Sequence, residues 1–275
     1  MNTEQQVAKH YTHGSLQQTI LDALKQMGKD PERFLPMDLS TGDELHLGWL
    51  PATARLAKDL GLASGMHVLD VGSGIGGPAR HFAEAHKCRI TGIDLTEEFV
   101  RVATELTRRC GLSDLVSFRQ ASALDLPFEG GTFDAATLIH VGMNIADKAK
   151  LFANVRRVLK PGALFGVYEV MRAGESDLPY PMPWAQTSET SFVETPETYR
   201  RLLTNAGFKI ENVDNWREFV LTLAREMREK VEKSGLPPLN QHILLGPMFR
   251  ERLANVMASL ERGIIAPVEI IARAA

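Results

Sequence analysis

The residues best placed to do chemistry are four glycines between positions 72 and 77, directly after the apolar run 68–71. The apolar run predicts a buried strand, and Pro78 suits the first turn of a following helix. Because glycine lacks a Cβ atom, it allows positive φ and the close approach of another molecule. Free N–H groups at the start of a helix favour a carboxylate or a phosphate. We therefore expect a strand–loop–helix unit that holds an anionic group; the alternative is a tight turn that binds nothing.

The glycine loop alone leaves the ligand open. Gly72 and Gly74 combine with Gly77 into the G-x-G-x-x-G pattern of dinucleotide folds, and with Gly76 into the G-x-G-x-G of methyltransferases. Asp94 ends the next predicted strand, twenty positions beyond Gly74. A carboxylate at that place accepts hydrogen bonds from the two hydroxyls of a ribose, which both NAD and S-adenosylmethionine carry. The alternative is a solvated acid at the end of a strand.

A repeated strand–helix pattern must position these residues. Predicted strands cover 68–71, 89–94, 115–119, 133–140 and 163–170, and predicted helices cover 53–60, 97–109 and a segment near 151–159. This alternation indicates a parallel sheet with helices on both faces, whose ligands bind beyond the carboxyl ends of the strands. Gly72, Asp94, Ser122 and His140 would then share one rim.

The composition excludes several classes of protein. The chain has 275 residues, 44% of them apolar, and a net charge of −3, which gives no electrostatic case for nucleic acid. Its apolar runs are too short to span a membrane, and its first residues lack the apolar core of a signal peptide. Cys88 and Cys110 form no C-x-x-C pair, so we expect neither a disulfide framework nor a metal site. We expect a cytoplasmic protein.

Five motifs in register resemble those of the class I S-adenosylmethionine-dependent methyltransferases, small-molecule type. They are VLDVGSGIGG, ITGIDLT, ALDLPF, FDAATLIHV and RRVLKPGALF, and they cover about residues 65–172. The resemblance implies an α/β fold: a Rossmann-like, seven-stranded, mostly parallel sheet with an antiparallel last strand, helices on both faces and a helical cap. It extends to sarcosine- and dimethylglycine-type enzymes and to natural-product enzymes, between which the sequence does not choose.

The resemblance also implies roles for particular residues. The S-adenosylmethionine site would be formed by Gly72, Ser73, Gly74, Gly76, Asp94, Leu95, Ser122, Ala123 and Ile139. Two departures stand out. Ser122 occupies the place of the family's usual acidic residue, so the adenine contact of that residue is less directly implied for this chain. Ala163 replaces the second glycine of the usual LKPGG.

Methyl transfer is an in-line displacement, in which the protein supplies alignment and excludes water. A hydroxyl or ammonium acceptor needs a base, and His140 is the candidate because imidazole titrates near neutral pH. The alternative for His140 is a histidine that only shapes the pocket. The candidate substrate-binding residues are Tyr11, His46, Trp49, Asn144, Tyr168 and Trp184.

We expect an N-terminal helical lid over 1–50, a cofactor-binding core over 51–219 and 263–275 with an insertion at 173–195, and a helical cap over 220–262. The predicted function is methyl transfer to O, N or C of a small molecule, with S-adenosylhomocysteine as the product. The alternatives are a nicotinamide-dependent oxidoreductase and a non-catalytic module that binds S-adenosylmethionine. The oligomeric state stays open.

Overall fold

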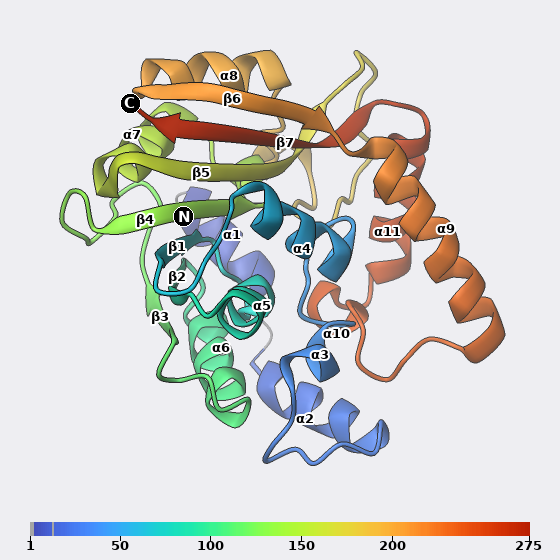
Figure 1. The fold of residues 1–275 in the computed structure, drawn as a ribbon. Helices are drawn as coiled ribbons and strands as arrows, with labels where there is room; N and C mark the ends of the chain where they lie inside the picture. The colour runs from blue at the N-terminus through green and yellow to red at the C-terminus, as the bar shows by residue number, and fades with distance from the viewer. Residues whose placement is uncertain (1–2, 13) are drawn as a thin grey trace.

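The computed structural model describes residues 3–12 and 14–275, and they form one seven-stranded sheet flanked by helices (Figure 1). The strands are β1 (His67–Val71), β2 (Arg89–Asp94), β3 (Val116–Gln120), β4 (Phe133–Ile139), β5 (Leu159–Arg172), β6 (Phe208–Asn215) and β7 (Ile265–Ala274). Their order is β3-β2-β1-β4-β5-β7-β6, and only β7 runs antiparallel to its neighbours β5 and β6. The predicted fold class is confirmed.

Helices surround this sheet. They are α1 (Thr3–Tyr11), α2 (Leu16–Gln26), α3 (Pro36–Leu39), α4 (Trp49–Asp59), α5 (Gly77–His86), α6 (Glu97–Arg109), α7 (Lys148–Val158), α8 (Pro196–Asn205), α9 (Arg217–Ser234), α10 (His242–Leu245) and α11 (Phe249–Glu261). One apolar core packs α7 and α8 against the sheet, and another packs α4 and α5 against it. None of the helices in the described part of the chain is both long and apolar enough to cross a membrane.

The parallel register brings the carboxyl ends of the strands to one rim. Val71 is paired with Ile93 on one side and with Leu138 on the other, and Ile139 is paired with Tyr168. The loops that follow β1, β2 and β4 therefore start side by side. This arrangement positions the glycine loop, Asp94 and His140 around one space.

Two helical parts lie over the same rim. Segment 1–50 contributes α1, α2 and α3, and α1 was not predicted as a helix. The segment between β6 and β7 contributes α9, α10 and α11, which lie to one side of the sheet in Figure 1. Of the 18 residues of α9, Val220 alone is buried. This helix therefore packs only weakly against the rest of the protein.

Candidate functional site

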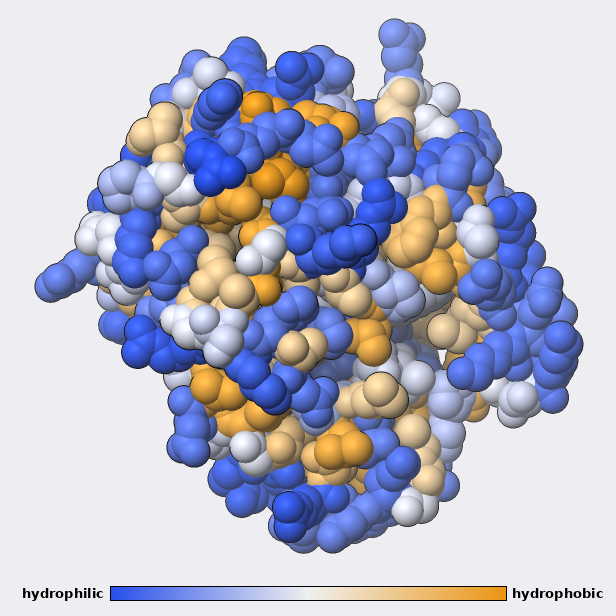
Figure 2. Space-filling view, in the orientation of Figure 1, coloured by the Kyte–Doolittle hydropathy of each residue, from blue (hydrophilic) through white to orange (hydrophobic). Residues whose placement is uncertain are grey.

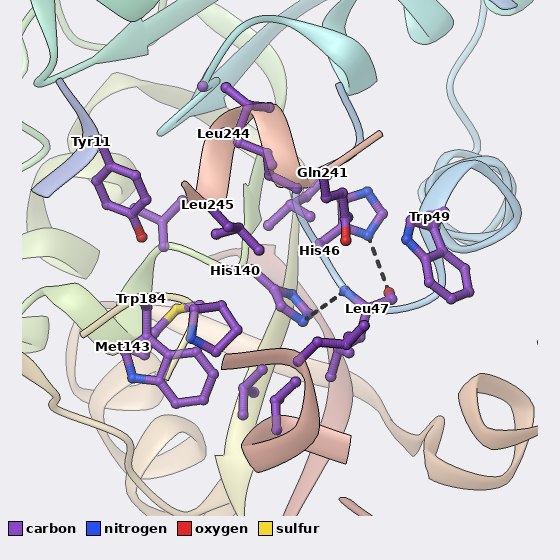
Figure 3. A pocket seen from close by; sticks show the side chains of 18 of the residues that line it. Tyr11, His46, Leu47, Trp49, His140, Met143, Trp184, Gln241, Leu244 and Leu245 are labelled. Carbon is purple, nitrogen blue, oxygen red and sulfur yellow. Dashed lines mark hydrogen bonds between the residues drawn. The ribbon is translucent and has the colours of Figure 1, made fainter. Parts of the chain in front are cut away.

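A cavity of about 1270 Å³ lies at the rim, between the sheet, segment 1–50 and the helices α9, α10 and α11. Its wall includes the glycine loop, the ends of β2 and β4, and apolar side chains of the three helices. Figure 3 shows His140 near its centre, with Leu47 and His46 on one side and Met143 and Trp184 on the other. Pockets for one small molecule measure roughly 300–1,000 Å³, so this volume is sufficient for two ligands.

The glycines of the loop serve two different needs. Gly72 has φ +75°, and a Cβ there would lie 2.3 Å from a methyl group of Val141. The packing therefore excludes any side chain at position 72. Gly74 has φ +52°, and its nearest neighbour on the Cβ side is a methyl group of Leu45 at 3.9 Å. Gly74 also lines the cavity. The open face needed for a ligand to approach the backbone is therefore at Gly74.

The sequence predicted free N–H donors in the loop, but three of the N–H groups already have acceptors within the protein. The N–H groups of Gly72 and Ser73 donate to the carbonyl of Ile93, at 2.9 and 2.8 Å. The Gly74 N–H donates to Oδ2 of Asp94 at 2.9 Å. The anion held by this loop is thus the carboxylate of Asp94. Because the N–H groups of Gly72, Ser73 and Gly74 are used to shape the turn, the first half of the loop is a poor phosphate cradle.

Asp94 lines the cavity, and each of its two carboxylate oxygens accepts a hydrogen bond from a backbone N–H. Oδ1 accepts from the Thr96 N–H at 2.8 Å, and Oδ2 accepts from Gly74. Burial raises the pKa of Asp94, while these hydrogen bonds act in the opposite direction. A carboxylate oxygen has capacity for a further hydrogen bond, so Asp94 can still accept the hydroxyls of a ribose.

The structure brings most of the predicted site residues to one cavity. Those that line it are Tyr11, His46, Trp49, Gly72, Gly74, Asp94, Leu95, Ala123, Ile139, His140, Asn144 and Trp184. The cavity wall leaves out Ser73, Gly76, Ser122 and Tyr168. Gly76 is instead the N-cap residue of α5, where a Cβ would lie 2.5 Å from the Phe118 ring. Tyr168 is fully buried, and its ring centroid lies 4.9 Å from that of the cavity-lining His140, so it lies behind the cavity wall.

His140 is held as a neutral imidazole. Its Nδ1 lies 3.1 Å from the carbonyl oxygen of Tyr168, which can only accept, so Nδ1 carries the proton. Nε2 therefore accepts, and its partner is the Leu47 N–H at 3.3 Å. Burial, followed by the nearby His46, lowers the pKa of His140 to about 3. A general base needs a free lone pair and a pKa near the working pH, and His140 has neither in this arrangement.

Leu47 is fixed by both of its backbone polar groups. Its N–H donates to His140, and its carbonyl accepts from the Tyr168 hydroxyl at 2.8 Å and from Nδ1 of His46 at 3.1 Å. The other nitrogen of His46 lies 2.7 Å from Oε2 of Glu44 and 2.9 Å from Oγ1 of Thr53. Both nitrogens of His46 thus face acceptor oxygens. These contacts fasten segment 44–48 to the ends of β4 and β5.

Two acidic residues of this region were not predicted. Glu169 is fully buried in β5 and accepts the N–H groups of Val141 and Gly142, at 2.8 and 2.7 Å. It supports the loop that follows His140. Glu4 of α1 lines the cavity, and its Oε1 accepts from the Ser122 hydroxyl at 2.5 Å. A local sequence pattern could not reveal either contact, because the residues in contact are 27 or more positions apart in the chain.

Comparison with known proteins identifies the central part of the chain. Residues 69–167 match a family model described as a methyltransferase domain. Over these residues the chain is therefore similar to methyltransferase domains, and the resemblance to S-adenosylmethionine-dependent methyltransferases inferred from its motifs is confirmed.

Particular relatives differ in what they methylate. The sterol 24-C-methyltransferase ERG6B of Gibberella zeae is 40% identical over 42% of this chain and 30% of that protein. The erythromycin 3''-O-methyltransferase of Saccharopolyspora erythraea is 32% identical over 61% of this chain and 58% of that protein. The chain thus spans less than two thirds of either relative.

One solved structure covers the whole chain. Geranyl diphosphate C-methyltransferase from Streptomyces coelicolor A3(2), with S-adenosyl-L-homocysteine bound, covers 100% of this chain and 99% of its own, with a TM-score of 0.71. The sequence identity is 18%, so this likeness establishes the fold alone.

Proposed function

We propose that the protein is an enzyme that transfers a methyl group from S-adenosylmethionine to O, N or C of a small molecule. One observation carries the proposal: the open face of Gly74 lies opposite the ribose-binding candidate Asp94, in a cavity with room for a second ligand. The relatives named above, by name a sterol 24-C-methyltransferase and an erythromycin 3''-O-methyltransferase, support it. The glycine pattern and Asp94 also suit NAD, but the family match and both named relatives favour methyl transfer over a nicotinamide oxidoreductase or a non-catalytic module.

The proposed cofactor site follows from the rim. Asp94 would accept the ribose hydroxyls, Leu95 and Ala123 would pack beside the adenine, and the backbone at Gly74 would approach the methionine part. Ser73 and Gly76, which do not line the cavity, would shape the loop from behind. When bound, the sulfonium supplies an already activated methyl group.

The chain's own contribution would be alignment and exclusion of water, since correct orientation alone is worth up to about 7–11 kcal/mol. Tyr11, Asn144 and Trp184 would position the acceptor: the Tyr11 hydroxyl donates to Oδ1 of Asn144 at 3.3 Å, and Nδ2 of Asn144 donates to the Trp184 carbonyl at 2.8 Å. His46 and Trp49 would complete this side of the cavity. Tyr168 would act through Leu47, and His140 would stand at the methyl-transfer point as a neutral group.

Titration calorimetry tests the proposal directly. We expect binding of S-adenosylmethionine and S-adenosylhomocysteine and no binding of NAD. Asp94→Ala should weaken cofactor binding at least about tenfold, because hydrogen bonds to a charged group are lost, whereas Asp125→Ala, at an exposed position outside the cavity wall, should not. Transfer of a labelled methyl group to an acceptor separates an enzyme from a binding module. Indifference to both adenosyl compounds would overturn the assignment.

We also propose the division into a lid (1–50), a core (51–219 and 263–275) and a cap (220–262), on the support that the lid and cap segments flank the cavity. A cytoplasmic location is proposed on the support of the free thiols of Cys88 and Cys110. A small-molecule acceptor, in place of nucleic acid, is proposed on the net charge of −3.

A further inference from the structure

The helix α9 presents an apolar stripe that no other part of the described chain covers fully. Leu223, Ala224, Met227 and Val231 follow Val220 at helical spacing, and all four are only half-buried. All four line the cavity, and the opposite face of the helix carries exposed charged residues such as Glu229. Figure 2 shows hydrophilic residues along the outer edge of this region, with apolar residues on its inner side. The apolar stripe therefore faces the cavity.

The stripe faces an apolar floor. Val170, Met143 and Trp184 belong to one apolar cluster beneath the cap, which Leu253 and Met257 of α11 extend. All five residues line the same cavity as the stripe of α9. Apart from Glu4 and Asp94, every charged residue in the cavity wall is exposed. These exposed residues are Asp147, Arg225, Glu226, Arg228, Lys230, Glu232, Arg250 and Glu261. Among the described residues, the cavity wall beyond the adenosyl side thus has no buried charged side chain to compensate a buried ion.

Resting on the proposed methyl transfer, we infer that the acceptor is a bulky, neutral, predominantly apolar molecule that lies between α9 and α11 and covers the stripe of α9. The cavity is continuous from Asp94 to α9, and its volume of about 1270 Å³ exceeds what one small ligand fills. A small zwitterionic amine would leave this apolar surface hydrated and its own charges unpaired. The inference therefore separates the two substrate types that the sequence left open.

Fluorescence of the neutral probe N-phenyl-1-naphthylamine tests the inference on the full chain. We expect the probe to bind, to be displaced by a neutral polycyclic alcohol, and not to be displaced by sarcosine. Met227→Asp, on the stripe, should weaken probe binding at least tenfold, and Glu229→Asp, on the opposite face of the same helix, should leave it unchanged. Because α9 buries so little, both variants should fold and bind S-adenosylmethionine with unchanged affinity.

Each other result has a definite meaning. Equal effects of the two variants, or displacement by sarcosine alone, would overturn the inference. A concentration-dependent dimer that excludes the probe would show that a second copy covers α9, and would overturn it as well. Failure of the wild-type protein to bind S-adenosylmethionine would instead remove the proposed function, whatever the probe does.

A second inference rests on a separate observation, the contact of Glu4 with Ser122. The Ser122 hydroxyl donates to Oε1 of Glu4 and accepts the Leu124 N–H at 3.0 Å, so the carboxylate is held at this edge of the cavity. The Ala121 N–H donates to the carbonyl of Asp94 at 3.0 Å, which places this edge beside the proposed ribose site. We infer that Glu4, from α1, accepts the hydrogen bond of the adenine amino group.

Comparison of S-adenosylhomocysteine with S-inosylhomocysteine, which has a carbonyl in place of the amino group, tests the role of Glu4 by calorimetry. The wild-type protein should prefer the adenosyl compound, and Glu4→Ala should reduce that preference about tenfold. Gln6→Ala, an exposed position on the same helix, is the control. An equal loss of affinity for both compounds would show that Glu4 only holds α1 in place, and would overturn the inference.

Discussion

The backbone at His140 has an unusual conformation that the surrounding contacts impose. Its φ is +53°, a region that residues other than glycine seldom adopt. The N–H of His140 and its ring both donate to the carbonyl of Tyr168, which fixes the ring over the end of β5. Nε2 then receives the Leu47 N–H. His140 therefore connects the sheet to segment 44–48, and we propose that it positions the site as a neutral group.

Substitution of His140 distinguishes positioning from base catalysis. His140→Ala should reduce turnover at least tenfold with little change in S-adenosylmethionine affinity, because Leu47 loses its anchor. His140→Gln, which can still accept a hydrogen bond, should recover part of that turnover. With a pKa of about 3, His140 stays neutral from pH 5.5 to 8, so it should add no step to the rate profile. A step near pH 6.5 that His140→Ala removes would instead establish the base.

The loop after β4 depends on a carboxyl group that the sequence does not reveal. Burial raises the pKa of Glu169 to about 7, against the hydrogen bonds from Gly142 and Val141. The unfolded chain loses this proton near pH 4.5. Since the folded protein holds the proton more tightly, the contribution of Glu169 to stability falls as the pH rises from about 4.5 to 7.

Replacement of Glu169 by Gln removes this titration while keeping an oxygen for the two N–H groups. Relative to wild type, Glu169→Gln should gain stability between pH 5 and pH 8, by about 2.5 kcal/mol. Denaturant unfolding at the two pH values measures the gain. Glu189→Gln, at an exposed position, should follow the wild type. A constant offset between Glu169→Gln and wild type at both pH values would contradict the assignment.

The elements differ in how far the sequence could predict them. α6 was predicted with its observed bounds, Glu97–Arg109, since its apolar stripe and the following Gly111 mark it clearly. α1 was missed because none of its residues is buried, and its apolar stripe is short, with Val7 and Tyr11 one turn apart. Polar contacts over long distances hold it, such as Tyr11 with Asn144, 133 positions away. A periodicity argument cannot detect a helix held in this way.

The same limit applies to the site residues. The sequence could place the glycine loop and the residues at the ends of the strands on one rim, because the carboxyl ends of parallel strands lie at the same edge of a sheet. Tyr168 could not be assigned to the cavity or the core, since β5 is buried on both faces and shows no alternation. The partners of His46 are close in sequence, Glu44 two positions before it and Thr53 seven positions after it, but no residue pattern shows that the turn before α4 brings both to its Nε2 atom.

At the scale of the whole molecule, the cavity joins parts of unequal stability. Three apolar clusters include residues of the sheet and stabilise it. In contrast, α9 buries one residue and carries exposed Arg225, Arg228, Lys230 and Lys233. An element with few buried contacts opens at a low free energy, and a ligand that binds only the closed form protects it. The two proposed ligands should therefore protect different segments.

Limited trypsin digestion of the full chain tests this independence. Without ligand, the first cuts should fall within 225–233, since α9 exposes its basic residues there. Saturating N-phenyl-1-naphthylamine should slow these cuts at least fivefold, because the probe covers the inner face of α9. S-adenosylhomocysteine alone should leave them nearly unchanged and should protect Lys9 of α1. Protection of both segments by either ligand alone would show that lid and cap close together, and would contradict two independent subsites.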